Sequence, residues 1–411
     1  MRILIYGINF APELIGIGKY TGEMAAFFAA HGHTVRVVTA PPYYPHWRVA
    51  PEYSAWAYTQ EKWQDVTVYR CPLWVPHCTD QYPTISGFQR ILHLASFAIS
   101  SLPVILGQAH WRPDWVIVLA PSIFDAPAGA LAARLARGRA WLHVQDFELD
   151  AALGLKMLPG MGLFSRLAQF LERSLYRSFE RISTISNRML AHLQEKGTTP
   201  ERTVLFPNWV DCRLIYPLYG YNGLRRELSI DGNCRVILYS GNIGQKQGLD
   251  VLIEAARSLA DEPGLIFLIC GEGSAKPRLA ALASGLPNVR FLPLQPPGRL
   301  NELLNLADIH VLPQSANAAD LVMPSKLAGM LASGRPVIVT ACPGTELADV
   351  MEPLGRVILP GRPAELADAI RTLLGDSAAQ ADLGRRGRAF VERTWSKEIV
   401  LERFLETLQA G

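Results

Sequence analysis

The sequence lacks the patterns that would place it in several specialised classes of protein. Its six cysteines form no CxxC pair and have no zinc-ligand spacing, which disfavours a disulfide framework or a structural zinc site. The net charge of +3, without any lysine-rich run, does not indicate a nucleic-acid-binding protein. We therefore expect a reduced, cytoplasmic, globular protein that does not bind nucleic acid.

Segments that target or anchor a protein are also scarce. Residues 1–7 lead directly into a strand-like run, so we expect no signal peptide. The longest apolar stretch, 91–109, contains His93 and Pro103, and we expect it not to span a membrane. The chain up to Leu205 holds 19 Lys and Arg against 15 Asp and Glu, whereas the remainder holds 21 against 22. This mildly basic first half suits peripheral contact with the inner face of the cytoplasmic membrane, and it is equally compatible with chance.

What the sequence does contain is a repeated alternation of apolar runs, glycine-rich loops and helical segments. Short strand-like runs occur at 3–6, 35–39, 115–119, 140–144 and 182–185, and the rhythm restarts at 235–240. This alternation predicts an α/β protein with two Rossmann-like doubly wound domains facing a central cleft. We place the first domain at 1–206, a linker at 207–223 and the second domain at 224–394. We expect a C-terminal helix at 395–411 to pack back on the first domain.

The first glycine-rich loop contains Gly16, Gly18 and Lys19. Glycines allow backbone N–H groups to approach an anion at the start of the next helix, so these residues could bind a phosphate or an acceptor. The dinucleotide pattern GxGxxG fails because Thr21 stands at its third position, which disfavours a nicotinamide-dependent dehydrogenase. A tight turn with only a structural role remains an alternative.

The second glycine-rich loop follows the run at 235–240 and is more informative. Gly241, Asn242, Lys246 and Gln247 lie in it, and we predict that they cradle the pyrophosphate of a donor. Glu272 belongs to a similar turn after the run at 265–270, and we assign it to the same donor site. A lysine that is simply solvated is the alternative interpretation of Lys246.

Three polar residues before the helical segment near 326–333 complete the predicted donor site. Asp320, Ser325 and Lys326 lie there. A cation in the first turn of a helix opposes the helix dipole unless an anion compensates for it. We therefore predict that Lys326 binds a phosphate or a sugar and takes part in catalysis, and a lysine with only a surface role is the alternative.

Two further groups of residues follow strand-like runs, where ligands bind in open α/β sheets. His143 and Asp146 close the run at 140–144, and we predict a catalytic role for at least one of them. Tyr43 and Tyr44 lie in a proline-rich aromatic loop at 41–47 that suits contact with a sugar acceptor. The apolar, partly basic stretches 88–106 and 153–176 are candidates for contact with a membrane surface, although most such stretches face a protein core.

The ordered set of motifs at 6–13, 16–24, 39–45, 142–146, 206–209, 239–248 and 324–326 resembles the family 4 retaining glycosyltransferases. Within that family it is most similar to the WcaI-type enzymes of colanic acid and related exopolysaccharide biosynthesis, from residue 1 to about residue 400. The resemblance implies a GT-B fold, a nucleoside-diphosphate sugar donor bound by the second domain, and a lipid-linked saccharide acceptor bound by the first. It also implies metal-independent chemistry with no cofactor, and it suggests GDP-fucose as the donor.

The sequence departs from the wider family at two positions. Asn242 and Gln247 stand where many relatives have Arg and Lys, and the paired glutamates of the family fall at Leu321 and Gly329. Asp320 and Lys326 are candidates to replace their contacts. A nucleotide-sugar epimerase with the same fold, or an inactive donor-binding partner subunit, remains an alternative to a hexosyltransferase.

Overall fold

The computed structural model describes residues 1–13, 16–76, 85–120, 124–147, 162–220, 222–315 and 323–410, with the backbone alone at 162–169 and at Lys246. The chain separates into two compact units. Unit 1 consists of Met1–Pro207 and Leu401–Gly411, and unit 2 consists of Asn208–Val400. Asp320, Leu321 and residues 153–161 lie outside the described residues, so the predictions made for them are not addressed by the structure.

Unit 1 is built on an eight-stranded sheet with the order β3-β4-β2-β1-β5-β6-β7-β8. Its strands are β1 (Arg2–Tyr6), β2 (Thr34–Thr39), β3 (Thr59–Trp63), β4 (Val66–Arg70), β5 (Trp115–Ala120), β6 (Arg139–Val144), β7 (Arg181–Thr184) and β8 (Thr203–Leu205). Neighbouring strands are parallel except for the β3–β4 pair. Its helices are α1 (Gly16–Ala30), α2 (Gly87–Gly107), η1 (Gln108–Trp111), α3 (Ala126–Ala136), α5 (Gly162–Arg177), α6 (Asn187–Glu195) and η2 (Pro200–Arg202).

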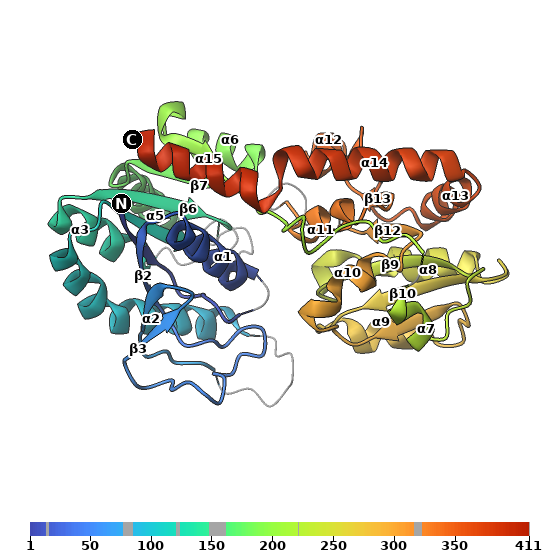
Figure 1. Ribbon diagram of the computed structural model, residues 1–411, viewed down its shortest axis with the longest axis horizontal. Helices are drawn as coiled ribbons and strands as arrows, with labels where there is room; N and C mark the ends of the chain where they lie inside the picture. The colour runs from blue at the N-terminus through green and yellow to red at the C-terminus, as the bar shows by residue number, and fades with distance from the viewer. Residues whose placement is uncertain are drawn as a thin grey trace. The chain divides into compact units, whose positions relative to one another are not determined.

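Unit 2 repeats the plan with a six-stranded parallel sheet in the order β11-β10-β9-β12-β13-β14. Its strands are β9 (Arg235–Ser240), β10 (Leu265–Cys270), β11 (Val289–Leu292), β12 (Ile309–Leu312), β13 (Val337–Thr340) and β14 (Arg356–Ile358). Its helices are α7 (Gly223–Glu227), η3 (Gln245–Gln247), α8 (Asp250–Ser258), α9 (Lys276–Leu282), η4 (Pro297–Arg299), α10 (Leu300–Leu304), α11 (Lys326–Ala332), α12 (Glu346–Met351), α13 (Pro363–Leu374) and α14 (Ser377–Thr394). Figure 1 shows both sheets among their helices.

The strand order explains where a ligand can bind in each unit. In unit 2 the chain leaves β9 for β10 on one side and later returns to β12 on the other side. In unit 1 it leaves β1 for β2 on one side and later returns to β5 on the other. Ligands of doubly wound proteins bind beyond the carboxyl ends of the strands at such reversals. Both glycine-rich loops predicted from the sequence directly follow the first strand of such a reversal.

The helix α15 (Lys397–Ala410) completes the core of unit 1 through its second half. The ring of Phe404 stacks on Phe206 at 4.1 Å between centroids and contacts Trp141 at 4.6 Å. The indole N–H of Trp115 donates a hydrogen bond to the carbonyl oxygen of Leu408 at 3.0 Å. Because these side chains are buried, the helix is part of the hydrophobic core of the unit.

The structure contains two local features that the sequence did not predict. The hairpin of β3 and β4 was missed because the side chains of β3 are mostly exposed and polar, which leaves no apolar run to recognise. Helix α2 continues through Pro103, which lies inside the apolar stretch 91–109. Pro103 is exposed, so water can solvate the carbonyl group that its missing N–H leaves without a partner. Among the described residues, one helix, Gly87–Trp111, is long and apolar enough to cross a membrane by length and composition alone.

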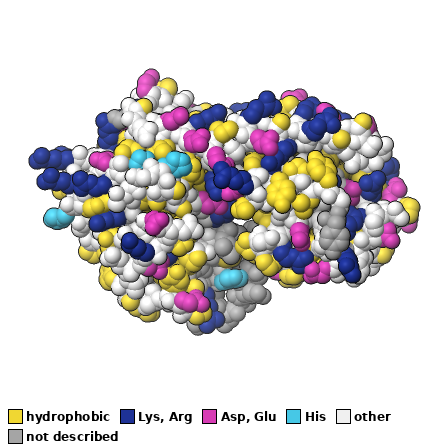
Figure 2. Space-filling view, viewed as in Figure 1, with side chains coloured by type: hydrophobic (Ala, Val, Ile, Leu, Met, Phe, Trp, Pro, Cys, Tyr) yellow, Lys and Arg dark blue, Asp and Glu magenta, His cyan; other side chains and the backbone are white. Residues whose placement is uncertain are grey.

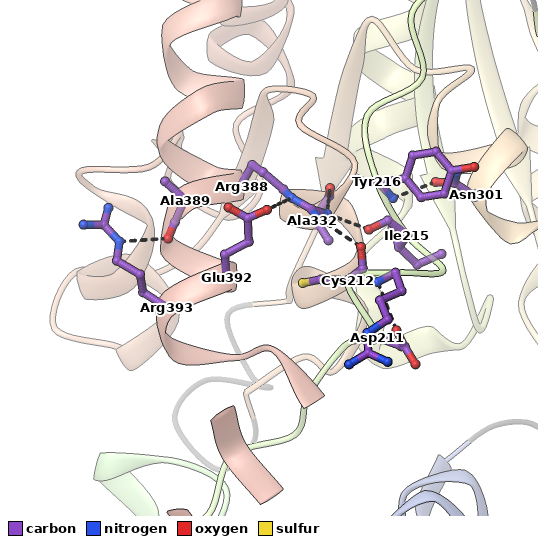
Figure 3. A network of polar contacts seen from close by, with 11 residues as sticks. Asp211, Cys212, Ile215, Tyr216, Asn301, Ala332, Arg388, Ala389, Glu392 and Arg393 are labelled. Atoms are coloured by element: carbon purple, nitrogen blue, oxygen red, sulfur yellow. Dashed lines mark hydrogen bonds and ion pairs between the residues drawn. The ribbon is translucent and has the colours of Figure 1, made fainter. Parts of the chain in front are cut away.

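A partly buried arginine binds the segment after Pro207 to the rest of unit 2 (Figure 3). The guanidinium of Arg388, on α14, donates hydrogen bonds to the carbonyl oxygens of Ile215 at 2.6 Å, Ala332 at 2.9 Å and Cys212 at 3.1 Å. Glu392, one turn further along α14, accepts a fourth bond at 2.6 Å. One side chain therefore connects α14, the end of α11 and the extended segment that leads into the unit.

We predict that Arg388→Ala lowers the free energy of unfolding of unit 2 by about 3 kcal/mol, because three carbonyl groups lose a charged donor. Urea denaturation with hydrogen exchange monitored on α11 and α14 measures this loss. The matched control is Arg393→Ala on the same helix. Among the described residues its guanidinium bonds to its own helix at Ala389, and its loss should cost less than about 0.5 kcal/mol. Equal losses for the two variants would contradict the role assigned to Arg388.

Candidate functional site

Two interlocked glycine turns form the centre of the candidate site in unit 2. They follow β9 and β10, which run parallel with Ser240 beside Cys270. The backbone N–H of Gly241 bonds to the carbonyl oxygen of Cys270 at 2.9 Å, and that of Ile243 bonds to Glu272 at 2.8 Å. A Cβ atom on Gly271 would lie only 1.9 Å from the carbonyl oxygen of Gly241. Only glycine therefore allows the two turns to approach this closely.

Lys326 extends from the first residue of α11 to the first glycine turn. Its ammonium nitrogen lies 4.5 Å from the centre of the Tyr239 ring and donates a hydrogen bond to the phenol oxygen of Tyr239 at 2.8 Å. It would lie 2.6 Å from a Cβ atom on Gly241, so it occupies the space that the missing side chain leaves. The phenol of Tyr239 in turn donates to the carbonyl oxygen of Asn242 at 2.5 Å.

The charge of Lys326 has no carboxylate partner in the part of the chain that the structure describes. Its side chain is partly exposed, and desolvation lowers the pKa of its ammonium group to about 8. Lys276, at the second glycine turn, differs because its ammonium group binds the carboxylate of Glu272 at 2.8 Å. Of these two lysines, Lys326 is therefore the one whose charge is available to a bound anion.

Two side chains of the loop after β9 offer further polar groups. The side chain of Asn242 is exposed, whereas the amide oxygen of Gln247 is buried and, within the described residues, accepts no hydrogen bond. A buried acceptor without a donor is costly, and a hydroxyl or N–H group of a ligand could satisfy it. Ser325 is exposed at the N-terminus of α11. The side chain of Lys246 lies outside the described part of the structure.

The candidate site in unit 1 is organised by a carboxylate that the sequence analysis missed. Glu13 lies between β1 and α1 and is 6% exposed. Its carboxylate accepts hydrogen bonds from the backbone N–H groups of Tyr43 at 3.2 Å and Tyr44 at 3.1 Å, and from the side chain of Asn9 at 2.9 Å. A Cβ atom on Gly18 would come within 2.4 Å of this carboxylate. Glu13 thus joins the glycine-rich loop to the loop that contains the two tyrosines.

Arg70 joins the same two loops from the end of β4. Its guanidinium donates to the carbonyl oxygens of Ala40 at 2.9 Å and Ala11 at 2.6 Å, and it forms an ion pair with Glu61 at 2.6 Å. Glu13 is the last residue of the motif at 6–13, but no role was predicted for it, and Arg70 lies outside the motifs. The sequence signal for Glu13 was weak, because it consisted only of a charged residue in a loop that is otherwise mostly small, apolar and proline residues.

Tyr43 and Tyr44 occupy different environments in their loop. Tyr43 is 6% exposed, and its ring packs against His93 of α2 at 4.6 Å between centroids, whereas Tyr44 is 39% exposed. Burial raises the pKa of both phenols, and the charge of nearby Arg90 partly offsets this increase. Tyr44 is therefore the residue of the pair that can contact a ligand. Gly16 lies beside it, where an added Cβ atom would contact the Tyr44 ring at 3.5 Å.

The remaining predicted residues of unit 1 lie on other elements than Glu13 and the two tyrosines. His143 is 2% exposed in β6, its Nδ1 atom lies 2.9 Å from the hydroxyl of Ser183, and burial lowers its pKa to about 3. With this pKa the imidazole is neutral near pH 7, which suits a residue that holds other groups in position better than one that takes up and releases protons. Asp146 is half-buried just beyond β6. Lys19 lies on α1 at 3.8 Å from Glu23. The roles predicted for these three residues stay predictions.

Comparisons with known proteins agree with this division of the chain. Residues 16–209 match the family model described as a glycosyl transferase 4-like domain, and residues 234–376 match the one described as glycosyl transferases group 1. The chain is 43% identical over 416 residues to a protein of Escherichia coli K12 named putative colanic acid biosynthesis glycosyl transferase WcaI, with 100% of both chains covered. The chain belongs to this glycosyltransferase family. The predicted enzyme class and family resemblance are therefore confirmed.

Solved structures confirm the predicted GT-B fold of this glycosyltransferase. The sucrose-phosphate synthase of Thermosynechococcus elongatus has a TM-score of 0.74 at 16% identity, with 100% of this chain and 98% of that chain covered. The Anabaena protein HepE, in a crystal structure with UDP and glucose, has a TM-score of 0.69 at 16% identity over 100% of both chains. At this level of identity the likeness concerns the fold alone.

We predict that Gly271→Ala destabilises unit 2 by about 3 kcal/mol or more, because its Cβ atom would collide with the backbone of Gly241 and its φ of +148° is strained for other residues. The control is Gly285→Ala, which also has a positive φ but has no atom within 4 Å of an added Cβ, and which should cost about 1 kcal/mol. Thermal and urea unfolding of the two variants would provide the comparison. Similar losses would show that the close approach of the turns is unimportant.

We predict that the stability of unit 1 falls as the pH rises from about 4.5 to about 7. Burial raises the pKa of Glu13 from its ordinary value of 4.5 to about 7, so between these values the native state holds a proton that the unfolded chain has released. The stabilisation is complete below the unfolded pKa and is lost through the folded one, by about 3 kcal/mol in total. Urea unfolding at several pH values should show this slope. Glu13→Gln should flatten it, whereas the exposed Glu52→Gln should not.

Proposed function

We propose that this glycosyltransferase transfers a sugar from a nucleoside diphosphate donor, bound by unit 2, to a lipid-linked saccharide acceptor, bound by unit 1. The observation that carries the proposal is the position of Lys326: a desolvated ammonium group beside a glycine turn, with no carboxylate partner in the described parts of the chain. The pathway would be exopolysaccharide synthesis of the colanic acid type, since the E. coli relative carries that name.

The donor diphosphate would lie against the two glycine turns. In this position Lys326 neutralises the negative charge that develops on the leaving phosphate, which is the largest electrostatic demand of the reaction. The backbone of Gly241 can approach closely because no side chain intervenes. Asn242 and the unpaired amide oxygen of Gln247 would bind hydroxyl or N–H groups of the nucleotide or sugar, and Ser325 would extend the same contacts. Glu272, held by Lys276, fixes the shape of the second turn.

The chemistry that we propose retains the configuration of the anomeric carbon. The bond between this carbon and the diphosphate oxygen breaks, and a bond to the acceptor hydroxyl oxygen forms on the same face. The acceptor proton passes to the departing phosphate oxygen, so the protein need not supply a base. The anomeric carbon acquires cationic character during this exchange, as in glycoside hydrolysis. No metal ion takes part in this scheme.

The acceptor would contact the loop that Glu13 holds in place. Tyr44 is exposed at this loop, and Arg90 lies close enough for its charge to act on both tyrosines. An exposed aromatic ring suits a sugar, and a neighbouring arginine suits the phosphate of a lipid carrier. The resemblance to fucosyltransferases suggests GDP-fucose as donor, whereas the UDP complex of the Anabaena protein makes a UDP-sugar the competing choice.

The proposal is tested first by the thermal stabilisation of the purified protein with GDP, UDP and their sugars. A ligand at 100 times its dissociation constant adds about 2.7 kcal/mol to the free energy of unfolding. A selective response to GDP and GDP-fucose supports the fucosyl assignment, and a response to UDP-sugars alone overturns it. Transfer is then followed by NMR, in which an inverted anomeric product would overturn the retaining scheme. Conversion of the donor without any acceptor would indicate an epimerase.

We predict that Lys326→Met lowers kcat/KM for transfer by on the order of 10²- to 10³-fold, because the leaving group loses its counter-charge. Steady-state kinetics with a saturating acceptor would measure this change. The matched comparison is Lys276→Met, whose charge is already neutralised by Glu272 and whose loss should be at least tenfold smaller. Equal losses, or an unchanged rate with Lys326→Met, would remove Lys326 from the mechanism.

A further inference from the structure

The helix α2 is apolar on two opposite sides, of which only one is covered by unit 1. Its buried side carries His93, Leu94, Phe97, Ser101 and Ile105. Its exposed side carries Phe88 (70% exposed), Ile91, Leu92, Ile99 (73% exposed) and Leu102. At 100° per residue these exposed side chains form one continuous stripe along the helix. Only 33% of the helix's most apolar 18-residue window is buried in the protein.

The neighbouring helix α3 also exposes large apolar side chains. Helices α2 and α3 are in contact, and α3 exposes Leu131 (44%) and Leu135 (59%), which are one turn apart. Tyr58, which is 55% exposed, reaches α2 by donating a hydrogen bond to the carbonyl oxygen of Ser100 at 2.9 Å. Exposed apolar surface that extends over two packed helices is unusual for a protein without a partner, and it indicates an interaction surface.

Within the two helical segments that carry this surface, the charged side chains have one sign. Residues 85–113 and 126–139 contain Arg90, Arg112, Arg134, Arg137 and Arg139, and they contain no Asp or Glu. Of these arginines, Arg139 lies 3.6 Å from the carboxylate of Glu180. Figure 2 shows Lys and Arg side chains projecting from the left edge of the view, where α3 lies in Figure 1. An apolar stripe bordered by arginines is complementary to an anionic lipid surface, which offers both acyl chains and phosphates.

The buried side of α2 prevents the helix from leaving the domain to span a bilayer. The hydroxyl of Ser101 lies 2.7 Å from that of Tyr6 on β1, and the hydroxyl of Ser100 donates to Pro72 at 2.5 Å. The ring of His93 bonds to the carbonyl oxygen of Trp74 at 2.8 Å. Breaking these contacts would expose polar groups and part of the core of unit 1. The helix can therefore contact a membrane only along its exposed side, lying in the plane of the interface.

A second copy of the chain fits this surface less well than a membrane does. In a two-fold symmetric dimer the same patch meets itself, so arginines would face arginines with no carboxylate in these segments to compensate. We propose that the exposed face of α2 and α3, defined by Phe88, Ile91, Leu92, Ile99, Leu102, Leu131 and Leu135, docks on an anionic bilayer. The proposal extends the lipid-linked acceptor of the proposed function, because it places the enzyme at the surface that would carry such an acceptor.

The test is flotation of the full-length protein with vesicles of phosphatidylcholine, alone or mixed with phosphatidylglycerol. The protein should float with the mixed vesicles and detach as salt is added. Phe88→Ser with Ile99→Ser should reduce the bound fraction by about tenfold or more, because two exposed apolar side chains lose their burial in the interface. The matched control is Leu214→Ser with Tyr219→Ser, two comparably exposed residues of unit 2, which should float as the unaltered protein does.

Arg134→Gln with Arg137→Gln should weaken binding to the mixed vesicles and reduce its dependence on salt. Failure of the unaltered protein to float, or equal flotation of the Phe88/Ile99 variant, overturns the proposal. A dimer in lipid-free solution that Phe88→Ser with Ile99→Ser dissociates would also overturn it and assign the surface to a second copy. The vesicles contain neither donor nor acceptor, so flotation succeeds or fails independently of the nucleotide panel that tests the proposed function.

Discussion

The close approach of two backbone turns, at Gly241 and Gly271, is the constraint on which the candidate donor site depends. Adjacent parallel strands bring the ends of β9 and β10 side by side, and the close approach of the two turns leaves no room for a side chain at Gly271. The space beside Gly241 is filled by the end of Lys326, which comes from a helix more than eighty residues later in the chain. The position of the Lys326 ammonium group thus follows from the absence of a side chain at Gly241.

The loop after the first strand is held in place by different interactions in the two units. In unit 2 the loop after the first strand is shaped by glycine and by backbone hydrogen bonds. In unit 1 the equivalent loop is shaped by two buried ionisable side chains: Glu13 accepts hydrogen bonds from two backbone N–H groups, and Arg70 donates to two carbonyl oxygens. A loop held by backbone contacts tolerates little variation in its own sequence, whereas a loop held by side chains depends on residues elsewhere, such as Arg70 at the end of β4.

This difference explains which parts of the molecule could be predicted from the sequence. The β9 loop was found because glycines after an apolar run leave a visible pattern, and Lys326 was found because a cation in the first turn of a helix conflicts with the dipole. Glu13 was missed because burial and hydrogen bonding, which no local pattern records, give it its role. The β3–β4 hairpin was missed for a related reason, since an exposed edge strand needs no apolar alternation. His143 is a residue type common in catalysis and lies at the end of a strand, so a catalytic role was predicted for it. Its burial results from tertiary packing, which the local sequence does not record.

The return of α15 to the core of unit 1 has a consequence for how the chain is made. Trp115 and Leu408, which share a hydrogen bond, are 293 residues apart, and all of unit 2 lies between them in the sequence. On the ribosome, unit 2 therefore emerges before the first domain to be translated can close its core around Phe404. Until α15 has been synthesised, the apolar surface formed by Trp141 and Phe206 stays exposed to solvent. During this interval the nascent protein is most prone to aggregate and to bind chaperones.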